Sequence, residues 1–192
     1  TLVSNFVNAL SLHAFRKEMM QFTMEYEPYH IESLPKTAKN VVLIIGESVN
    51  PHYMSLFGYG QDTTPLISEF RKANTANLVV SRMLSTGVFT APAITKLMNI
   101  VREPGNMVPV IQKSHNLIYL AKANGFKTAW IGNQASNNLV YAGIEKADTL
   151  ITSQTMNPLD YSRDGDDRLL EDLQRYQWGD KNFIVLHFRN LH

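Results

Sequence analysis

Apolar and polar positions change their pattern along the chain, and from residue 40 onward they describe two kinds of element. Short, nearly continuous apolar runs predict strands over residues 41–45, 126–131, 148–151 and 183–187. Apolar residues spaced three or four positions apart predict helices over residues 65–74, 91–101, 108–124 and 166–176. Strands interleaved with helices indicate an α/β fold, a mostly parallel sheet flanked by helices, with strand 41–45 at its centre.

Capping and turn residues set the predicted bounds of two of these helices. Pro65 suits the first turn of a helix, and Thr64 before it is a typical N-cap residue. Gly125 follows the helix predicted over 108–124 and stands where a left-handed residue commonly ends a helix.

The first 39 residues differ from the rest of the chain. A helical stripe predicts one helix over residues 1–26, through Val3, Phe6, Val7, Leu10 and Ala14. Pro28 and Pro35 break helix and indicate an extended linker over residues 27–39. Two interpretations remain open: a helix packed on the domain, or a connector from a segment further upstream.

Composition narrows the classes of protein. A chain of 192 residues with 44% hydrophobic and 18% charged residues fits one globular domain and excludes wholesale disorder. A net charge of +1 gives no electrostatic reason to expect a nucleic-acid partner. With no cysteine, the chain has no disulfide, thiolate zinc site or cysteine nucleophile. The absence of a Gly-x-x-x-x-Gly-Lys motif excludes a P-loop nucleotide binder.

Polar residues follow three of the predicted strands, and ligands of open parallel sheets bind beyond the carboxyl ends of strands. The segments concerned are Gly46-Glu47-Ser48, Gly132-Asn133-Gln134 and the stretch from His187 to His192. Glu47 comes directly after a buried strand, where a carboxylate is costly unless it is paired or bound to metal. The alternative for Glu47 is a loop cap.

The segment 85–92 places hydroxyls and a glycine before a helix, with Thr90 at or just before the helix N-terminus. Free amides and the helix dipole favour an anion there. A hydroxyl in that position is a candidate nucleophile if a divalent metal lowers its pKa. The alternative is that Thr90 only caps the helix.

Taken together, these segments resemble the phosphoethanolamine transferases of the alkaline phosphatase and sulfatase superfamily. Residues 41–65, VVLIIGESVNPHYMSLFGYGQDTTP, look like the opening of the catalytic domain in this family. Segment 85–92 resembles the nucleophile segment, with Thr90 in the nucleophile position, and 125–134 resembles the next block. The likeness covers most of residues 40–192 and looks nearest to the branch that modifies the lipopolysaccharide core.

The resemblance implies zinc chemistry on a phospholipid donor. Glu47 and Thr90 would be metal ligands, and Thr90 would take phosphoethanolamine from phosphatidylethanolamine and pass it to lipid A or the core of lipopolysaccharide. His192, Asn133 and Gln134 would bind substrate. The resemblance also implies the bacterial inner membrane as location, with the catalytic domain facing the periplasm.

One departure from the family bears on activity, because its later Asp-His metal ligands have no counterpart in this chain. We therefore expect residues 40–192 to be a partial catalytic domain, truncated at the C-terminus. Residues 1–39 would follow a missing membrane domain, and this chain by itself would be inactive and bind metal weakly. A phosphoglycerol transferase, a sulfatase-like hydrolase and a non-catalytic binding module remain alternatives. A sulfatase is disfavoured because residues 90–94 lack the arginine of its Cys/Ser-x-Pro-x-Arg motif.

Overall fold

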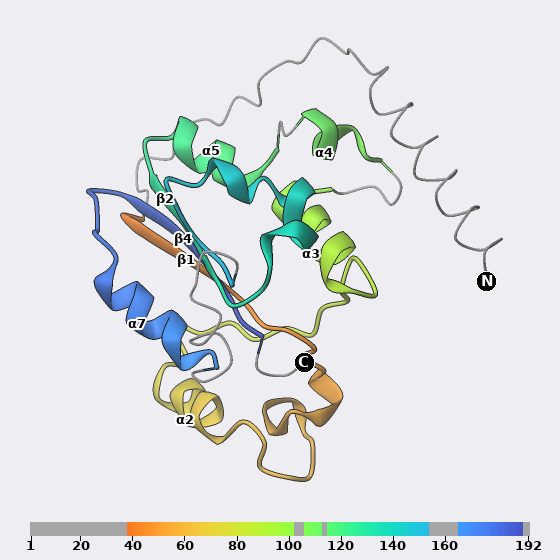
Figure 1. The fold of residues 1–192 in the computed structure, drawn as a ribbon. Helices are drawn as coiled ribbons and strands as arrows, with labels where there is room; N and C mark the ends of the chain where they lie inside the picture. Colours follow the sequence, from red (N-terminus) through yellow and green to blue (C-terminus); the bar gives the residue numbers. More distant parts are fainter. Residues whose placement is uncertain (1–37, 102–105, 113–114, 154–164, 190–192) are drawn as a thin grey trace, which may run out of the picture.

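The computed structural model describes residues 38–101, 106–112, 115–153 and 165–189. The helix predicted over 1–26 and all but the last two residues of the linker predicted over 27–39 lie outside these ranges. The centre of the structure is a sheet of parallel strands (Figure 1), namely β1 (Asn40–Ile45), β2 (Lys127–Gly132), β3 (Thr149–Ile151) and β4 (Asn182–His187). The predicted mostly parallel sheet flanked by helices is confirmed.

The order of the strands differs from the prediction. The sheet runs β1-β4-β2-β3, so β1 is an edge strand among the described residues and β4 and β2 are central. Every residue of β4 is buried, whereas Val42 and Ile44 on β1 are 42% and 60% exposed. A continuous apolar run predicts a strand, but the order of strands depends on which segments pair, and the run does not contain that information.

Helices cover both faces of the sheet. Their bounds are α2 (Pro65–Ala73), α3 (Thr90–Met98), α4 (Val108–Gln112), α5 (Leu117–Ala123) and α7 (Asp167–Arg175), with 3₁₀ turns η1 (Pro51–Tyr53), η2 (Ser55–Phe57), η3 (Ser136–Ala142) and η4 (Ile144–Lys146). Figure 1 shows α3, α4 and α5 on one side of the sheet and α7 on the other. None of the helices in the described part of the chain is long and apolar enough to span a membrane.

Alternating side chains of the central strands build two cores, one on each face of the sheet. Trp130 of β2 and Val185 of β4 pack with residues of α3 and α5. Ile131 and Ile184, their neighbours along the strands, pack with Leu169 of α7 on the opposite face. Because both faces are covered, the two central strands read as continuous apolar runs in the sequence.

The helix predicted over 108–124 is wrong as one element, because the structure has two helices there. Asn116 has an extended backbone and caps α5, its side chain accepting hydrogen bonds from the amides of Ile118 and Tyr119. Its amide group also donates to Asn99 Oδ1 at 3.1 Å and to the carbonyl of Ala142 at 2.8 Å. These contacts with residues far along the chain favour a break between α4 and α5, and the helical spacing of apolar residues in the sequence does not indicate that break.

The two predicted boundary residues behave differently. Thr64 stands at the N-cap of α2, but its hydroxyl does not cap that helix. It instead accepts from the amide of Leu56 and contacts Ser55 Oγ, both at 2.9 Å, and so fixes η2. Gly125 has φ +77°, the left-handed conformation expected after the end of α5.

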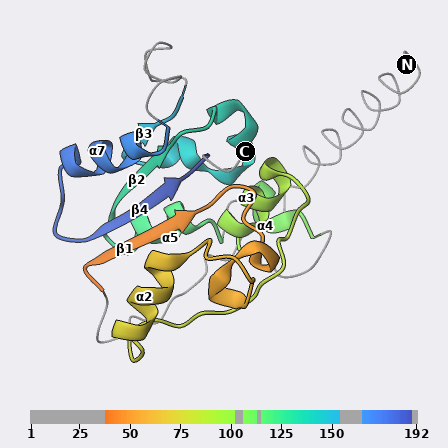
Figure 2. The same cartoon turned by 90° about the horizontal axis from the view of Figure 1, so that it is seen from below.

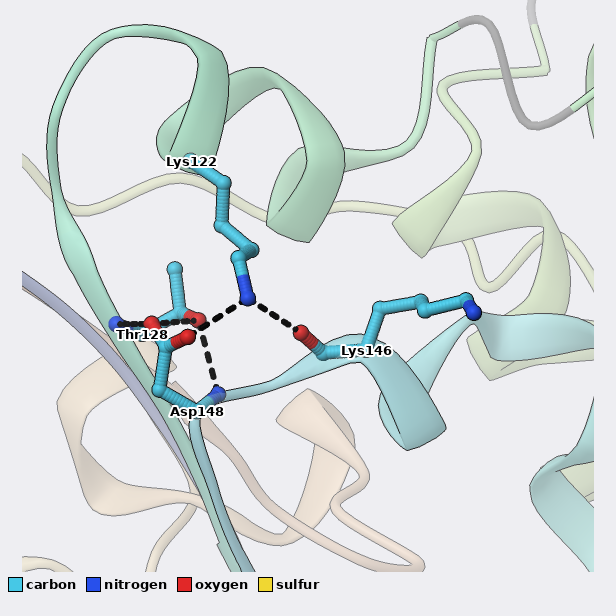
Figure 3. Close-up of polar contacts among 4 residues, drawn as sticks. All are labelled: Lys122, Thr128, Lys146 and Asp148. Carbon is cyan, nitrogen blue, oxygen red and sulfur yellow. Dashed lines mark hydrogen bonds and ion pairs between the residues drawn. The ribbon is translucent and has the colours of Figure 1, made fainter.

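A polar cluster ties the amino ends of β2 and β3 to α5 (Figure 3). The carboxylate of Asp148 accepts from the amide and hydroxyl of Thr128 at 2.8 and 2.9 Å and from Lys122 Nζ at 2.5 Å. Lys122 Nζ also donates to the carbonyl of Lys146 at 3.0 Å. Burial raises the pKa of Asp148, but the hydrogen bonds from Lys122 and Thr128 outweigh it and leave the pKa below its usual value.

We expect Asp148→Asn to lower the free energy of unfolding by about 1 kcal/mol at pH 7, a value reduced for the partial exposure of the pair. Because the pKa of Asp148 is lower in the folded state, its contribution is present above the unfolded-state pKa and is lost as the pH falls through the folded-state value. Urea titrations between pH 7 and pH 3 measure both effects. Equal acid sensitivity of the wild type and Asp148→Asn over that range would contradict this account.

Candidate active site

The carboxyl ends of three strands meet at one edge of the sheet. In the strand register Ile45 of β1 and Gly132 of β2 both lie beside His187 of β4. The segments that follow these residues therefore emerge together, and Figure 2 shows β1 and β4 pointing toward the same edge. This is the edge at which the sequence predicts the functional residues.

Glu47 and Thr90 meet at this edge, as predicted. Thr90 Oγ1 donates a hydrogen bond to Glu47 Oε2 at 2.9 Å, across 43 positions of sequence. Glu47 follows β1, while Thr90 is the first residue of α3, and both side chains are half-buried. The proximity of these two residues is confirmed, while their roles in metal binding and catalysis remain proposals.

The geometry argues against Thr90 as a simple helix cap. The N-cap residue of α3 is Phe89, which makes no side-chain cap, and Thr90 comes one position later with its hydroxyl turned to Glu47. Gly87 lets the preceding loop pack closely on α3, because a Cβ there would lie 2.7 Å from the amide nitrogen of Ala93. The loop and the first turn of α3 thus present the hydroxyl at the sheet edge.

Both oxygens of the Glu47 carboxylate have hydrogen-bond donors. Oε1 accepts from the backbone amide and the hydroxyl of Ser48, each at 3.2 Å, and Oε2 accepts from Thr90 and from Gln134 Nε2, the latter at 2.8 Å. Ser48 has φ +53°, a left-handed conformation that is unusual for a residue other than glycine. The sequence signals Ser48 only through its place after Glu47, so its contribution was not predicted.

A cavity of about 310 Å³ opens beside this pair. Its lining includes Glu47, Ser48, Ser85, Gly87 and Thr90. The cavity is therefore bounded by the polar segment that follows β1 and by the loop that leads into α3.

Asn133 and Gln134, predicted to bind substrate, have separate partners. Gln134 Nε2 donates to Glu47, whereas Asn133 Nδ2 donates to the carbonyl of Gly165 at 3.0 Å and to Asp166 Oδ1 at 3.2 Å. Asp166 also accepts the amide of Arg189 on both carboxylate oxygens, each at 2.9 Å. The part played by Asp166 was missed from the sequence, where it is only the first residue of the helix predicted over 166–176.

His187 is the last residue of β4, at the carboxyl end of the sheet, and is fully buried. Its ring makes an edge contact with Trp130, with centroids 5.5 Å apart, and neither ring nitrogen has a hydrogen-bond partner within the described ranges. Burial lowers the pKa of His187, while the charges of Glu47 and Asp166 oppose this. His192, the other histidine predicted at the site, lies outside the described residues.

The donor set agrees in part with a zinc site. Carboxylate and hydroxyl oxygens are chemically suitable, and those of Glu47 and Thr90 lie 2.9 Å apart. A catalytic zinc takes three protein ligands, and no group of three or more His, Asp or Glu side chains in the described ranges could hold a metal ion. Glu47 and Thr90 thus supply part of such a site, and at least one more donor would have to come from elsewhere.

Comparison with known proteins identifies the family of this chain. The sequence profile of the Sulfatase family matches residues 39–192, which is most of the chain. The chain belongs to the sulfatase family. The match covers every strand of the sheet and both Glu47 and Thr90.

Relatives of this sulfatase-family chain include named transferases. The phosphoethanolamine transferase EptC of Escherichia coli K12 is 30% identical over 96 residues, which cover 50% of this chain and 16% of EptC. YhbX of the same organism is 27% identical over 97% of this chain. The chain spans 33% of the length of YhbX, about a third.

Solved structures agree with the fold. The C-terminal periplasmic domain of Escherichia coli EptC, crystallised as a complex with zinc, has a TM-score of 0.65 and 25% identity, covering 80% of this chain and 44% of that domain. The integral membrane protein lipooligosaccharide phosphoethanolamine transferase A of Neisseria meningitidis has a TM-score of 0.67 and 20% identity, covering 98% of this chain and 35% of that protein. At that identity the second likeness concerns the fold alone.

Proposed function

We propose that the full-length protein to which this sulfatase-family domain belongs carries out zinc-dependent transfer of phosphoethanolamine from the phospholipid phosphatidylethanolamine to lipid A or the core of lipopolysaccharide. The observation that supports the proposal most is the 2.9 Å hydrogen bond between Thr90 Oγ1 and Glu47 Oε2, at the start of α3 and beside a cavity. A hydroxyl at a helix N-terminus with a carboxylate partner suits attack on a phosphodiester.

The proposed reaction has two displacements on phosphorus. Thr90 Oγ bonds to phosphorus while the bond to the diacylglycerol oxygen breaks, and the released diacylglycerol carries a proton away. An oxygen of the acceptor then bonds to phosphorus while the bond from phosphorus to Thr90 Oγ breaks, and the proton that the acceptor loses restores the Thr90 hydroxyl. In the resting state Glu47 Oε2 accepts a hydrogen bond from the Thr90 hydroxyl, and the free amides of the first turn of α3 favour the negative phosphate.

Glu47 and Thr90 would contribute two of the ligands to zinc. A bound zinc ion lowers the pKa of a hydroxyl and polarises phosphoryl oxygen. We further propose that the domain faces the periplasm at the bacterial inner membrane, that residues 40–192 are part of the catalytic domain, and that residues 1–39 follow a membrane domain.

A donor assay tests this function in the protein at its full natural length. We expect transfer of labelled ethanolamine phosphate from phosphatidylethanolamine to lipopolysaccharide, at least about tenfold faster than transfer of glycerol phosphate from phosphatidylglycerol. Thin-layer chromatography and mass spectrometry of the acceptor measure both products. A preference for phosphatidylglycerol would indicate a phosphoglycerol transferase, hydrolysis of a sulfate ester would indicate a sulfatase, and no turnover would favour a binding module.

A further inference from the structure

We propose that Gln134 is a positioning residue that fixes the carboxylate of Glu47, and that Asn133 and Asp166 in turn hold Gln134 in place. The proposal deepens the proposed function and rests on it only as far as Glu47 serves catalysis. It gives Asn133 and Gln134 a different role from the substrate binding expected from the sequence.

The side-chain amide of Gln134 is held by contacts within the protein. Its side chain is 8% exposed, and Nε2 donates to Glu47 Oε2 at 2.8 Å and to the carbonyl of Phe188 at 3.4 Å. An amide nitrogen has two protons, and both of these acceptors belong to the protein. The amide nitrogen of Gln134 is therefore directed at Glu47 and the backbone of Phe188.

A second layer of contacts fixes the backbone of this segment. The amide of Asn133 donates to the carbonyl of His187 at 3.0 Å, which extends the pairing of β2 with β4 by one residue. The side chain of Asn133, 5% exposed, bonds to Gly165 and to Asp166. Because Asp166 also accepts the amide of Arg189, one buried carboxylate joins the ends of β2 and β4 to the start of α7.

Gln134 and the candidate nucleophile Thr90 contact the same oxygen of Glu47. Thr90 Oγ1 and Gln134 Nε2 both donate to Oε2 of Glu47, so the place of Gln134 sets the place of the oxygen that Thr90 contacts. Glu47 stands on a loop, and Gln134 adds to the contacts with Ser48 and Thr90 that restrict the rotamers of its unbranched side chain. Groups that orient a ligand or a catalytic carboxylate typically change its affinity or activity when they are removed.

Kinetics of the full-length protein separate positioning from substrate binding. We expect Gln134→Met, which keeps the length but removes the donor, to lower kcat by about 10- to 100-fold and to leave KM for phosphatidylethanolamine within about twofold. Gln134→Glu, which sets two carboxylates together, should lower kcat further. A raised KM with unchanged kcat would overturn the proposal and assign Gln134 to substrate binding.

Thr128→Val is the matched structural control. Thr128 lies on β2, the strand that precedes Gln134, and is fully buried. The substitution removes a hydroxyl that donates to the carboxylate of Asp148 and accepts from its amide, at the opposite end of the sheet. We expect this variant to lose stability and to keep kcat. If Thr128→Val lowers kcat as much as Gln134→Met, the effect of Gln134 is structural and the proposal is wrong.

A measurement without substrate tests the contact between Gln134 and Glu47 separately from the proposed transferase activity. In nitrogen-15 NMR spectra of this chain, Glu47→Ala should shift the side-chain amide of Gln134 and speed its proton exchange, while Glu69→Ala on the exposed surface of α2 should not. If the amide responds but no phospholipid is a donor, the proposed function fails and the positioning of Glu47 stands. If Glu47→Ala leaves the amide unchanged, the positioning role is wrong whatever the activity.

Discussion

Thr90→Ala in the full-length protein should reduce phosphoethanolamine transfer by at least about a thousandfold, because removing a nucleophile takes away the covalent route. The free energy of unfolding should change by no more than about 1 kcal/mol, since the hydroxyl does not cap α3 and its one described partner is Glu47. Transfer rates and urea denaturation of the same preparation measure the two effects. Thr90→Ser, which retains a hydroxyl, is the matched control and should keep part of the activity.

Mass spectrometry identifies the nucleophile directly. After incubation with phosphatidylethanolamine in the absence of acceptor, the wild type should carry a phosphoethanolamine adduct on the peptide that contains Thr90. Ser85 and Thr86 are the rival hydroxyls, and both already donate to backbone carbonyls, Ser85 to Gly87 at 2.7 Å and Thr86 to Ala93 at 3.2 Å. An adduct on either rival, or an active Thr90→Ala enzyme, would refute the assignment.

Glu47→Gln should also remove most of the activity, by at least about 100-fold, because the substitution takes away the negative charge that Thr90 and Gln134 contact. An amide is a poor metal ligand beside a carboxylate, so the affinity for zinc should fall as well. The assays are transfer rate and zinc binding by calorimetry on the full-length protein at one fixed pH.

Glu69→Gln controls for the change in net charge. Glu69 is exposed on α2, so its substitution should alter neither transfer nor zinc affinity. Undiminished zinc affinity in Glu47→Gln would exclude Glu47 as a ligand. Undiminished transfer would remove it from the catalytic machinery altogether.

Position in the sequence made Glu47 and Thr90 candidates, and the family resemblance was needed to favour a site over a loop cap and a helix cap. Glu47 comes shortly after an apolar run that predicts a strand, and parallel strands bring their carboxyl ends to one edge, so a carboxylate there was a candidate for a site as well as for a loop cap. Thr90 precedes a helix and matches the nucleophile position of the resembled family. The hydrogen bond between them joins residues 43 positions apart, and only the fold shows that it exists.

Gln134 and Asn133 show where the sequence stopped being informative. Their place after β2 predicted that they lie at the functional edge, and they do. The direction of each side chain depends on partners in other segments, Glu47 for Gln134 and Asp166 for Asn133. The sequence therefore predicted substrate binding for both residues, although the amide of Gln134 contacts Glu47 and that of Asn133 contacts Asp166.

The sequence by itself determined the kinds of element and the edge of the sheet that carries the site, because hydrophobic period and strand direction are local properties of the chain. Only the tertiary structure decided that β4 separates β1 from β2, that Asn116 divides a predicted helix, and that Gln134 contacts Glu47. Each of these depends on pairing between residues far apart in the chain. A hydrogen bond or strand pairing of that kind is selected by the free energy of the whole fold, so no local pattern specifies it.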